Sequence, residues 1–383
     1  MPLRDLPRAP LALLATCVFF AICTEMLPVG LLPQIAAGLD ISASTAGILV
    51  SSYAVIVAIM SVPIAAVAER WPRRRVLAVL LTTYAVSNLI FAAAPDDAVA
   101  MVARVIGGVA HAGFFAVAIA AAVSLVDPAS SGRAIAVVLT GNAIALVFGV
   151  PLGTVLGTAL GWRWAFVVIA VALSGLAVAV LRVLPPRDPP RTNARIPVMT
   201  GIRRPAVIVM SVVITLLALG HFTLYTYVSP LLLHDGITHP DVGAVLFGYG
   251  CGGVVGLVAA GWAVSRRPGL ALVADIVLMC LSLVLAAVIG SSGGIIAVVA
   301  LWGVAFGAFP TLTQTVMLRA AGDATDAASS LVNATTNLGI AGGALVGSRL
   351  LGVVAVPALG WIGAILVAAS FLVYLVGVRR VNL

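Results

Sequence analysis

Twelve long runs of apolar residues, separated by short polar segments, constrain this chain more than any other feature of its sequence. Each run is long enough to cross about 30 Å of hydrocarbon as a helix, which takes about 20 residues. The chain is 62% hydrophobic and only 9% charged, whereas about 25% of the residues of a soluble protein are charged. We therefore expect an all-α membrane protein with twelve transmembrane helices. The runs lie at approximately 11–34, 46–68, 75–94, 98–124, 134–158, 163–184, 205–233, 241–264, 269–290, 294–318, 327–350 and 356–378.

The arginines predict the orientation of these helices. All 21 basic residues are arginine, and eighteen of them fall in segments that share a side of the membrane with the two termini. By the positive-inside rule, both termini are expected in the cytoplasm, with the chain in the cytoplasmic membrane of a bacterium. The net charge of +8 is scattered in short clusters and forms no face, so nucleic acid is not expected as a partner. The first run is too long for a cleavable signal peptide.

The middle of the chain divides it into two halves. The segment 185–204 is rich in Pro and Arg and is expected to be a cytoplasmic linker between six-helix bundles at 1–184 and 205–383. A shift of 196 residues places Tyr53 on Tyr249, and neighbouring Gly, Arg and Pro residues coincide at the same shift. A repeat without inversion predicts two pseudo-symmetric bundles related by an axis along the membrane normal.

One carboxylate, Glu25, lies deep in the first run, about 14 residues or about 21 Å from its cytoplasmic end. A charge in hydrocarbon is costly, and Arg104 is expected at a similar depth, so the two should pair. Burial favours a neutral carboxyl and a nearby guanidinium favours a charged one, so moving Arg104 would change the protonation of Glu25. His111 lies two turns deeper on the same face as Arg104. We expect these three residues to couple proton movement to cargo movement, the alternatives being a static ion pair and a structural histidine.

The second half carries aromatic residues where the first carries titratable ones. By shifts of 197 and 195, Glu25 corresponds to Phe222 and His111 to Phe306, which predicts an apolar cargo wall in the second half. Core packing and interhelical hydrogen bonds are the alternatives. The remaining intramembrane acid, Asp275, is expected to pair with Arg266 or Arg267. The candidate substrate-binding residues are His221, Phe222, Tyr225, Tyr227, Phe306 and Phe309, with the polar residues Asn142, Gln314, Asn333 and Asn337.

Four motifs carry a family resemblance: Thr24–Pro33, Ala65–Arg75, Arg104–Gly108 with His111 and Phe114 after it, and Gly149–Gly153 followed by Gly157. With these, the chain resembles the major facilitator superfamily and its twelve-helix drug:proton antiporters. The closest likeness is to the branch of chloramphenicol-resistance, sugar-efflux and arabinose-efflux proteins. The second motif has Glu69 and Pro72 where the family pattern has Asp and Gly. The resemblance implies gating or structural roles for Glu69, Arg70, Arg73, Arg74, Gly149, Pro151, Gly153 and Gly157.

Together these features predict a proton-coupled secondary transporter that exports small, fairly apolar molecules by alternating access, working as a monomer in the lipid bilayer. The alternative is a facilitator, exporter or importer of sugar-like or nucleoside-like solutes. An enzyme is not expected, because no metal cluster, nucleophile with a base or nucleotide loop lies in or beside the runs. The four cysteines have no metal-ligand spacing, and no metal or cofactor is expected.

Overall fold

The computed structural model describes residues 6–68, 70–127, 130–186, 204–321 and 325–381. Within these segments the regular elements are all helices, joined by short turns, and no strand occurs in them. Eleven helical segments are long and apolar enough to cross a membrane. The expected all-α membrane fold is confirmed. With 27 residues, α15 is long enough to be the twelfth crossing, but its described residues are not as apolar as those eleven segments.

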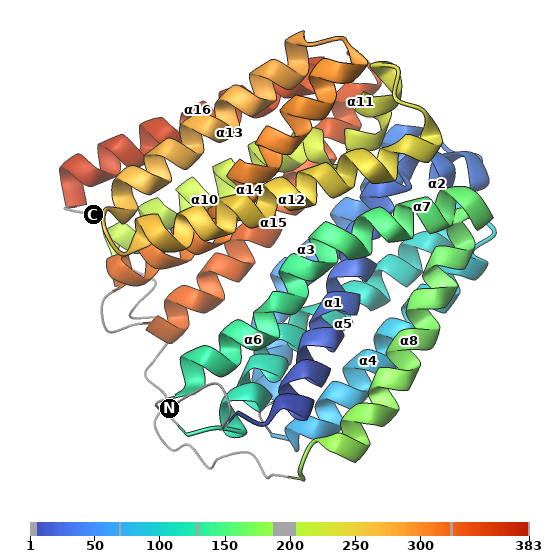
Figure 1. The fold of residues 1–383 in the computed structure, drawn as a ribbon, viewed down its shortest axis with the longest axis vertical. Helices are drawn as coiled ribbons and strands as arrows, with labels where there is room; N and C mark the ends of the chain where they lie inside the picture. The colour runs from blue at the N-terminus through green and yellow to red at the C-terminus, as the bar shows by residue number, and fades with distance from the viewer. Residues whose placement is uncertain (1–5, 69, 128–129, 187–203, 322–324, 382–383) are drawn as a thin grey trace.

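The first six crossings pack against one another as one bundle (Figure 1). Its central helices are α1 and α5, and α4 packs against both α5 and α8. The elements in chain order are α1 (Arg8–Gly30), α2 (Leu32–Gly38), α3 (Ala43–Ala68), α4 (Arg73–Ala93), α5 (Asp97–Ser124), α6 (Ser131–Ile144), the π-helical segment η3 (Ala145–Gly149), α7 (Val150–Leu160) and α8 (Trp162–Val183).

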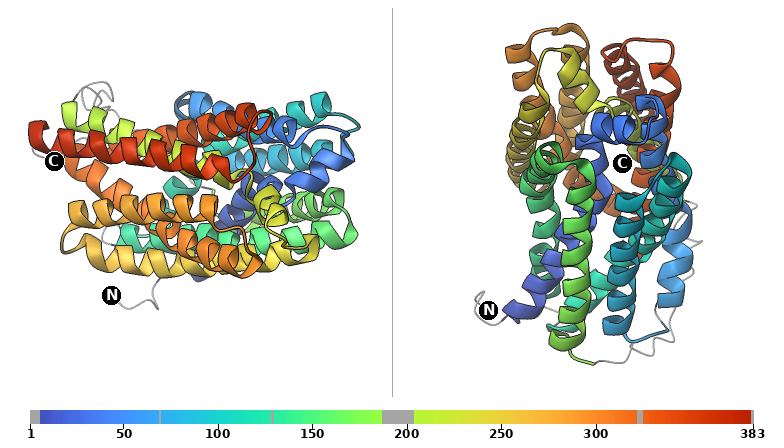
Figure 2. Two further views of the ribbon diagram at one scale, coloured as in Figure 1. Left: turned by 90° about the horizontal axis from the view of Figure 1, so that it is seen from above. Right: turned by 90° about the vertical axis from the view of Figure 1, so that its right-hand side faces the viewer.

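The other six crossings form a second bundle beside the first, as the views in Figures 1 and 2 show from three sides. In this bundle α10 packs against α15 and α16, and α14 packs against α12 and α13. The elements are α10 (Pro205–Tyr225), α11 (Val228–His234), the short η4 (His239–Asp241), α12 (Val242–Val264), α13 (Pro268–Val288), α14 (Ser292–Ala321), α15 (Thr325–Leu351) and α16 (Ala358–Val381).

Prolines interrupt several crossings that the sequence presents as single runs. The first run is divided between α1 and α2 around Leu31, with Pro33 near the start of α2. The fifth run contains η3, and Pro151 is the second residue of the helix α7 that follows it. Proline has no N–H, so Pro151 cannot donate to the carbonyl four residues earlier, and the chain passes through a wider π-helical turn.

The two bundles meet closely at one side of the molecule. We call the side at which α1 begins and α16 ends the terminal side, and the opposite side the far side. At the far side, Ser44 Oγ on α3 donates to the Ser348 main-chain oxygen on α15 at 2.6 Å. Ser229 Oγ on α11 donates to the carbonyl oxygens of Val29 and Gly30 at 3.0 and 2.9 Å. The far side is therefore closed by contacts between the two halves.

Candidate functional site

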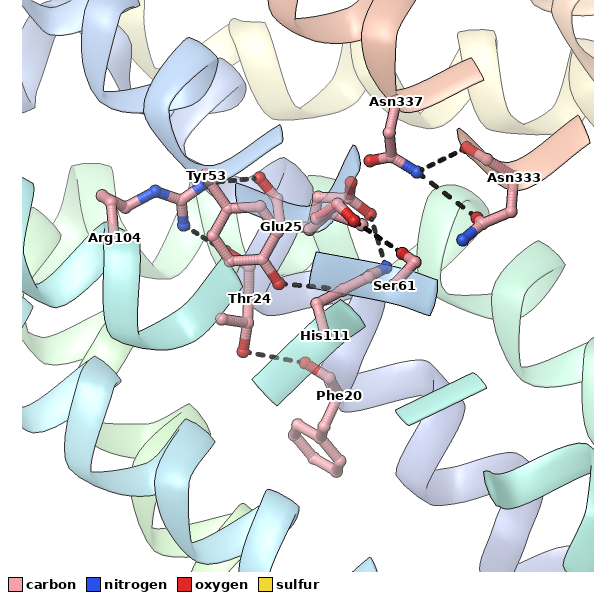
Figure 3. Close-up of polar contacts among 10 residues, drawn as sticks. Phe20, Thr24, Glu25, Tyr53, Ser61, Arg104, His111, Asn333 and Asn337 are labelled. Atoms are coloured by element: carbon pink, nitrogen blue, oxygen red, sulfur yellow. Dashed lines mark hydrogen bonds and ion pairs between the residues drawn. The ribbon is translucent and has the colours of Figure 1, made fainter. Parts of the chain in front are cut away.

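A cluster of three buried polar side chains lies inside the first bundle, contributed by α1, α3 and α5 (Figure 3). Glu25 and His111 are 5% and 4% exposed, and Glu25 Oε2 lies 3.7 Å from His111 Nε2. On the other side of the imidazole, Tyr53 Oη lies 2.9 Å from His111 Nδ1. If Tyr53 donates this hydrogen bond, a neutral His111 carries its proton on Nε2, facing the carboxylate.

The Arg104 guanidinium contacts main-chain oxygens of α1. Its Nη1 donates to the Thr24 oxygen at 2.9 Å and its Nη2 to the Glu25 oxygen at 3.3 Å. Its Nε donates to the Leu49 oxygen at 3.1 Å, and its guanidinium lies 4.1 Å from the centre of the Tyr53 ring. The expected depth match between Arg104 and Glu25 is correct.

The expected direct pairing of the guanidinium with the Glu25 carboxylate is wrong for this conformation. Among the described residues, the side chain that approaches this carboxylate is the imidazole of His111, with Nε2 3.7 Å from Oε2, and the contact is an ion pair only with a protonated imidazole. The reason lies four residues after Thr24, where Pro28 inside α1 has no N–H to donate to the Thr24 carbonyl. A buried carbonyl without a donor is costly, and Arg104 satisfies it. The spacing from Thr24 to Pro28 is a sequence signal for this contact that residue type alone does not reveal.

The second bundle holds an aromatic cluster at the corresponding positions. His221 and Phe306 stack with ring centres 4.2 Å apart, and Phe222 lies edge-on to both rings. Tyr225 stacks on His221 at 4.9 Å and on Tyr249 at 4.9 Å. Three of the five residues expected to form the cargo wall, Phe222, Tyr225 and Phe306, are therefore in mutual contact, together with the candidate His221. A fourth, Phe309, stacks on Phe306 at 6.0 Å.

Two members of this cluster, Trp302 and Tyr249, were not among the candidate site residues. Trp302 Nε1 donates to His221 Nδ1 at 3.0 Å. An indole N–H can only donate, so Nδ1 accepts and a neutral His221 carries its proton on Nε2. Trp302 lies nine residues after Gly293 in an otherwise apolar run, and the repeat offered no signal, since its counterpart Gly107 has no side chain.

Tyr227 lies apart from this cluster. Its hydroxyl donates to the Ala344 oxygen on α15 at 2.8 Å. A Cβ added at Gly47 of α3 would lie 1.9 Å from that hydroxyl, so Tyr227 fills the contact between the two halves near the far side. Tyr227 therefore lies in the contact between the halves at the closed far side and not in the aromatic cluster.

The four amide side chains occupy three helices. Asn337 Nδ2 on α15 donates to the Asn333 main-chain oxygen at 3.0 Å, and Figure 3 shows both asparagines in the same view as Glu25 and His111. α15 packs along α3, the helix of Tyr53. Asn142 on α6 and Gln314 on α14 are half-buried.

The remaining motif residues have structural contacts. Arg73 and Arg74 donate to the Ala120 and Leu184 oxygens at 2.8 and 3.4 Å, within the first bundle, and Arg70 is exposed. Glu69 lies outside the described residues. Asp275 is 4% exposed, and its carboxylate oxygens have no hydrogen-bond partner in the described part of the chain. Its expected pairing with Arg266 or Arg267 is therefore wrong, and the Arg266 guanidinium instead stacks over Trp262, 3.8 Å from the ring centre.

The glycine motif brings α7 against α1. A Cβ added at Gly149 would lie 2.4 Å from Cys23 Sγ, and at Gly157 it would lie 2.5 Å from a methyl carbon of Leu31. A Cβ at Gly153 would lie 2.8 Å from a methyl carbon of Leu27. The motif thus permits close approach of two helices. Pro151 also contributes to the junction of the halves, because its carbonyl oxygen would lie 3.0 Å from a Cβ at Gly243 of α12.

Solved transporter structures share this architecture. A bacterial homologue of the human lysosomal transporter Spinster, in an inward-facing and unoccupied conformation, matches with a TM-score of 0.78 and 14% identity, covering 97% of both chains. A mutant of the nucleoside transporter NupG matches with a TM-score of 0.76 and 13% identity, covering 97% of this chain and 99% of that one. At these identities the likeness concerns the fold.

Sequence comparison supplies the family. A protein of Mannheimia succiniciproducens named "Probable sugar efflux transporter" is 31% identical over 363 residues, covering 94% of this chain and 91% of that protein. The sequence pattern of the family described as Major Facilitator Superfamily matches residues 14–344. The chain therefore belongs to the Major Facilitator Superfamily and is a multi-pass membrane transporter, not an enzyme.

Proposed function

We propose that this transporter exports small, fairly apolar molecules in exchange for protons. The observation that carries the proposal is the buried approach of Glu25 Oε2 to His111 Nε2 at 3.7 Å. Ionisable residues within membrane spans are rare because they are costly, and acid and histidine pairs are typical of proton relays. With Tyr53 on Nδ1, the imidazole presents one defined nitrogen to the carboxylate.

In the proposed cycle, the bundles 1–184 and 205–383 rock about the midplane as two bodies joined by the linker 185–204. Both termini face the cytoplasm, so the closed far side is the outer face. When that face opens, Glu25 takes up a proton and its attraction to His111 is lost. When the cytoplasmic face opens, the proton leaves and cargo competes for the space beside the carboxylate. Arg104 fixes α1 and α5 at this depth in a monomeric transporter.

The aromatic cluster of the second bundle supports a fairly apolar cargo. His221, Phe222, Tyr225 and Phe306 offer ring faces and one imidazole N–H. A second candidate is a sugar-like or nucleoside-like solute, favoured by the name of the 31% identical relative and by the buried amide of Asn337. A sugar-like cargo would bind through Asn333 and Asn337, and an apolar one through Phe222 and Phe306.

The test uses inverted membrane vesicles that contain the full chain and measures cargo uptake driven by an imposed pH gradient. Glu25→Gln keeps the shape of the side chain but cannot release a proton, so uptake should fall to the level of vesicles without the protein. Asp275→Asn is the matched control, because it neutralises a buried acid outside the site and should leave uptake unchanged. Full gradient-driven uptake by the Glu25→Gln variant would refute proton coupling through this residue.

The same vesicles distinguish the two cargo classes. A panel of apolar drug-like compounds and a panel of sugars and nucleosides compete for uptake of one labelled compound. Under the apolar assignment, Phe306→Ala should change the ranking of the apolar panel while gradient dependence persists. Competition by sugars that is lost in Asn337→Ala and kept in Phe306→Ala would establish the second candidate instead.

A further inference from the structure

Several rings of the aromatic cluster lie in nearly parallel planes. The plane of Phe306 makes an angle of 10° with that of His221, 14° with that of Tyr225 and 15° with that of Phe309. Its angle with the plane of Tyr249 is 29°. Aromatic side chains pack edge-to-face as readily as they stack, so close packing alone does not require this alignment. Rings that share one orientation present a surface that suits a flat molecule.

Phe306 is the ring of this set that a ligand can reach. It is half-buried, whereas His221, which stacks on it, is 1% exposed. Pro310 and Gln314 follow Phe306 at four-residue spacing and are exposed and half-buried, so this face of α14 is uncovered. Because α14 packs against α10, α12, α13 and α15 of its own bundle, the uncovered face is the one toward the first bundle. A molecule between the bundles would therefore meet the cluster at Phe306.

His221 supplies a hydrogen-bond donor that the described part of the chain leaves unused. Trp302 Nε1 donates to Nδ1, so Nδ1 carries no proton and the imidazole is neutral, with its proton on Nε2. Nε2 is buried and has no hydrogen-bond partner among the described residues. A buried N–H without an acceptor is costly. Such a group beside a reachable ring is suited to an acceptor oxygen of a ligand.

We propose that the exported molecule is planar and carries a hydrogen-bond acceptor, such as a carbonyl oxygen, at its edge. Its ring lies parallel to Phe306, and its oxygen accepts the hydrogen bond of His221 Nε2. This cargo class is a narrower form of the apolar cargo proposed above and rests on that proposal. The recognition belongs to the second half, because the repeat places Gly107 and His111 where the second half has Trp302 and Phe306.

The test measures equilibrium binding of three bicyclic compounds to the purified full chain in detergent, with protein-free micelles as the baseline. Coumarin is planar and has a carbonyl oxygen, octahydrocoumarin keeps that oxygen on a puckered ring system, and naphthalene is planar without an acceptor. Coumarin should bind about tenfold more tightly than either of the others. No pH gradient is present, so this test and the transport test of Glu25→Gln can fail independently.

Two variants separate the hydrogen bond from the ring plane. His221→Phe keeps a ring in the stack but removes the N–H, so coumarin affinity should fall about tenfold while naphthalene affinity stays unchanged. Phe306→Leu removes the flat face and should abolish the preference for coumarin over octahydrocoumarin. The control is Tyr84→Phe, which removes a buried hydroxyl from α4 in the first bundle and should bind all three compounds as the wild type does.

The wild type alone can overturn the proposal, even if His221→Phe fails to fold. Equal affinities for coumarin and octahydrocoumarin would mean that the ring planes do not select flat molecules. Equal affinities for coumarin and naphthalene would mean that the N–H of His221 has no part in binding. Unchanged coumarin affinity in a folded His221→Phe protein would refute that hydrogen bond as well.

Discussion

At the scale of single residues, the Tyr53 hydroxyl defines what His111 offers to Glu25. Its Oη lies 2.9 Å from Nδ1, while Nε2 faces the carboxylate. Tyr53→Phe removes the hydroxyl and keeps the ring beneath Arg104, so the imidazole can place its proton on either nitrogen. Loss of one buried hydrogen bond costs about 1 kcal/mol. Gradient-driven uptake should fall about fivefold at equal protein level.

The second half supplies the control for this change. Tyr249 is the repeat counterpart of Tyr53, and its hydroxyl has no hydrogen-bond partner among the described residues. Tyr249→Phe should therefore leave both thermal stability and proton coupling unchanged. Coupling that is insensitive to Tyr53→Phe but lost in Tyr249→Phe would mean that the hydroxyl beside His111 has no part in the relay.

The sequence allowed the depths of the site residues to be predicted, but not which of their atoms are in contact. The rise of an α-helix was enough to place Glu25 and Arg104 at one depth. Which atoms meet depends on the main chain, and Pro28 redirects Arg104 to the Thr24 carbonyl. Side-chain charge alone therefore predicted the wrong partner for Glu25, and the pairing with His111 needed three helices in three dimensions.

At the scale of elements, apolar length located the crossings but not their breaks. The run at 205–233 contains α10 and α11, and the run at 134–158 contains a π-helical segment. The described part of α15 is too polar to stand out by composition, because it packs between α3 and α10 and few of its side chains need to face lipid. A helix that is surrounded by other helices does not need the apolar surface that contact with lipid requires. Only the structure shows which helices are surrounded in this way.

The contact of α12 with η3 provides a test at this scale. A Cβ added at Gly250 would lie 2.5 Å from Val147 Cα and 2.8 Å from the Leu146 oxygen in the other half. Main-chain atoms cannot move aside cheaply, so Gly250→Ala should destabilise the closed far side by about 1 kcal/mol or more. Labelling of a single cysteine introduced by Ser348→Cys should then become about fivefold faster with a polar thiol reagent.

Gly248 is the matched control for Gly250 because it lies on the same helix. A Cβ added there meets nothing within 4 Å. Gly248→Ala should leave the labelling rate at the wild-type value. Equal acceleration by both substitutions would assign the effect to helix propensity instead of to contact between the halves.

At the scale of the whole molecule, the internal repeat predicted two similar halves but not how they are tilted. Tyr53 and Tyr249 occupy equivalent places in the two halves. Tyr53 lies beside His111, and Tyr249 lies beside Phe306, the repeat counterpart of His111. Which side is closed depends on contacts such as the one between Ser44 and Ser348, two residues that are 304 positions apart in the chain. Small residues of this kind carry no sequence signal of their own, so the closed side could not be predicted.

These serines allow alternating access to be tested directly. The two hydroxyl oxygens are 3.1 Å apart, so Ser44→Cys combined with Ser348→Cys should form a disulfide upon oxidation. The bond would hold the far side shut, and uptake should stop and return after reduction. Each single substitution, oxidised in the same way, should transport normally. Alternating access requires the far side to open once in every cycle, whereas a channel-like path does not. Continued uptake by the cross-linked protein would therefore contradict rocking of the halves about a central site.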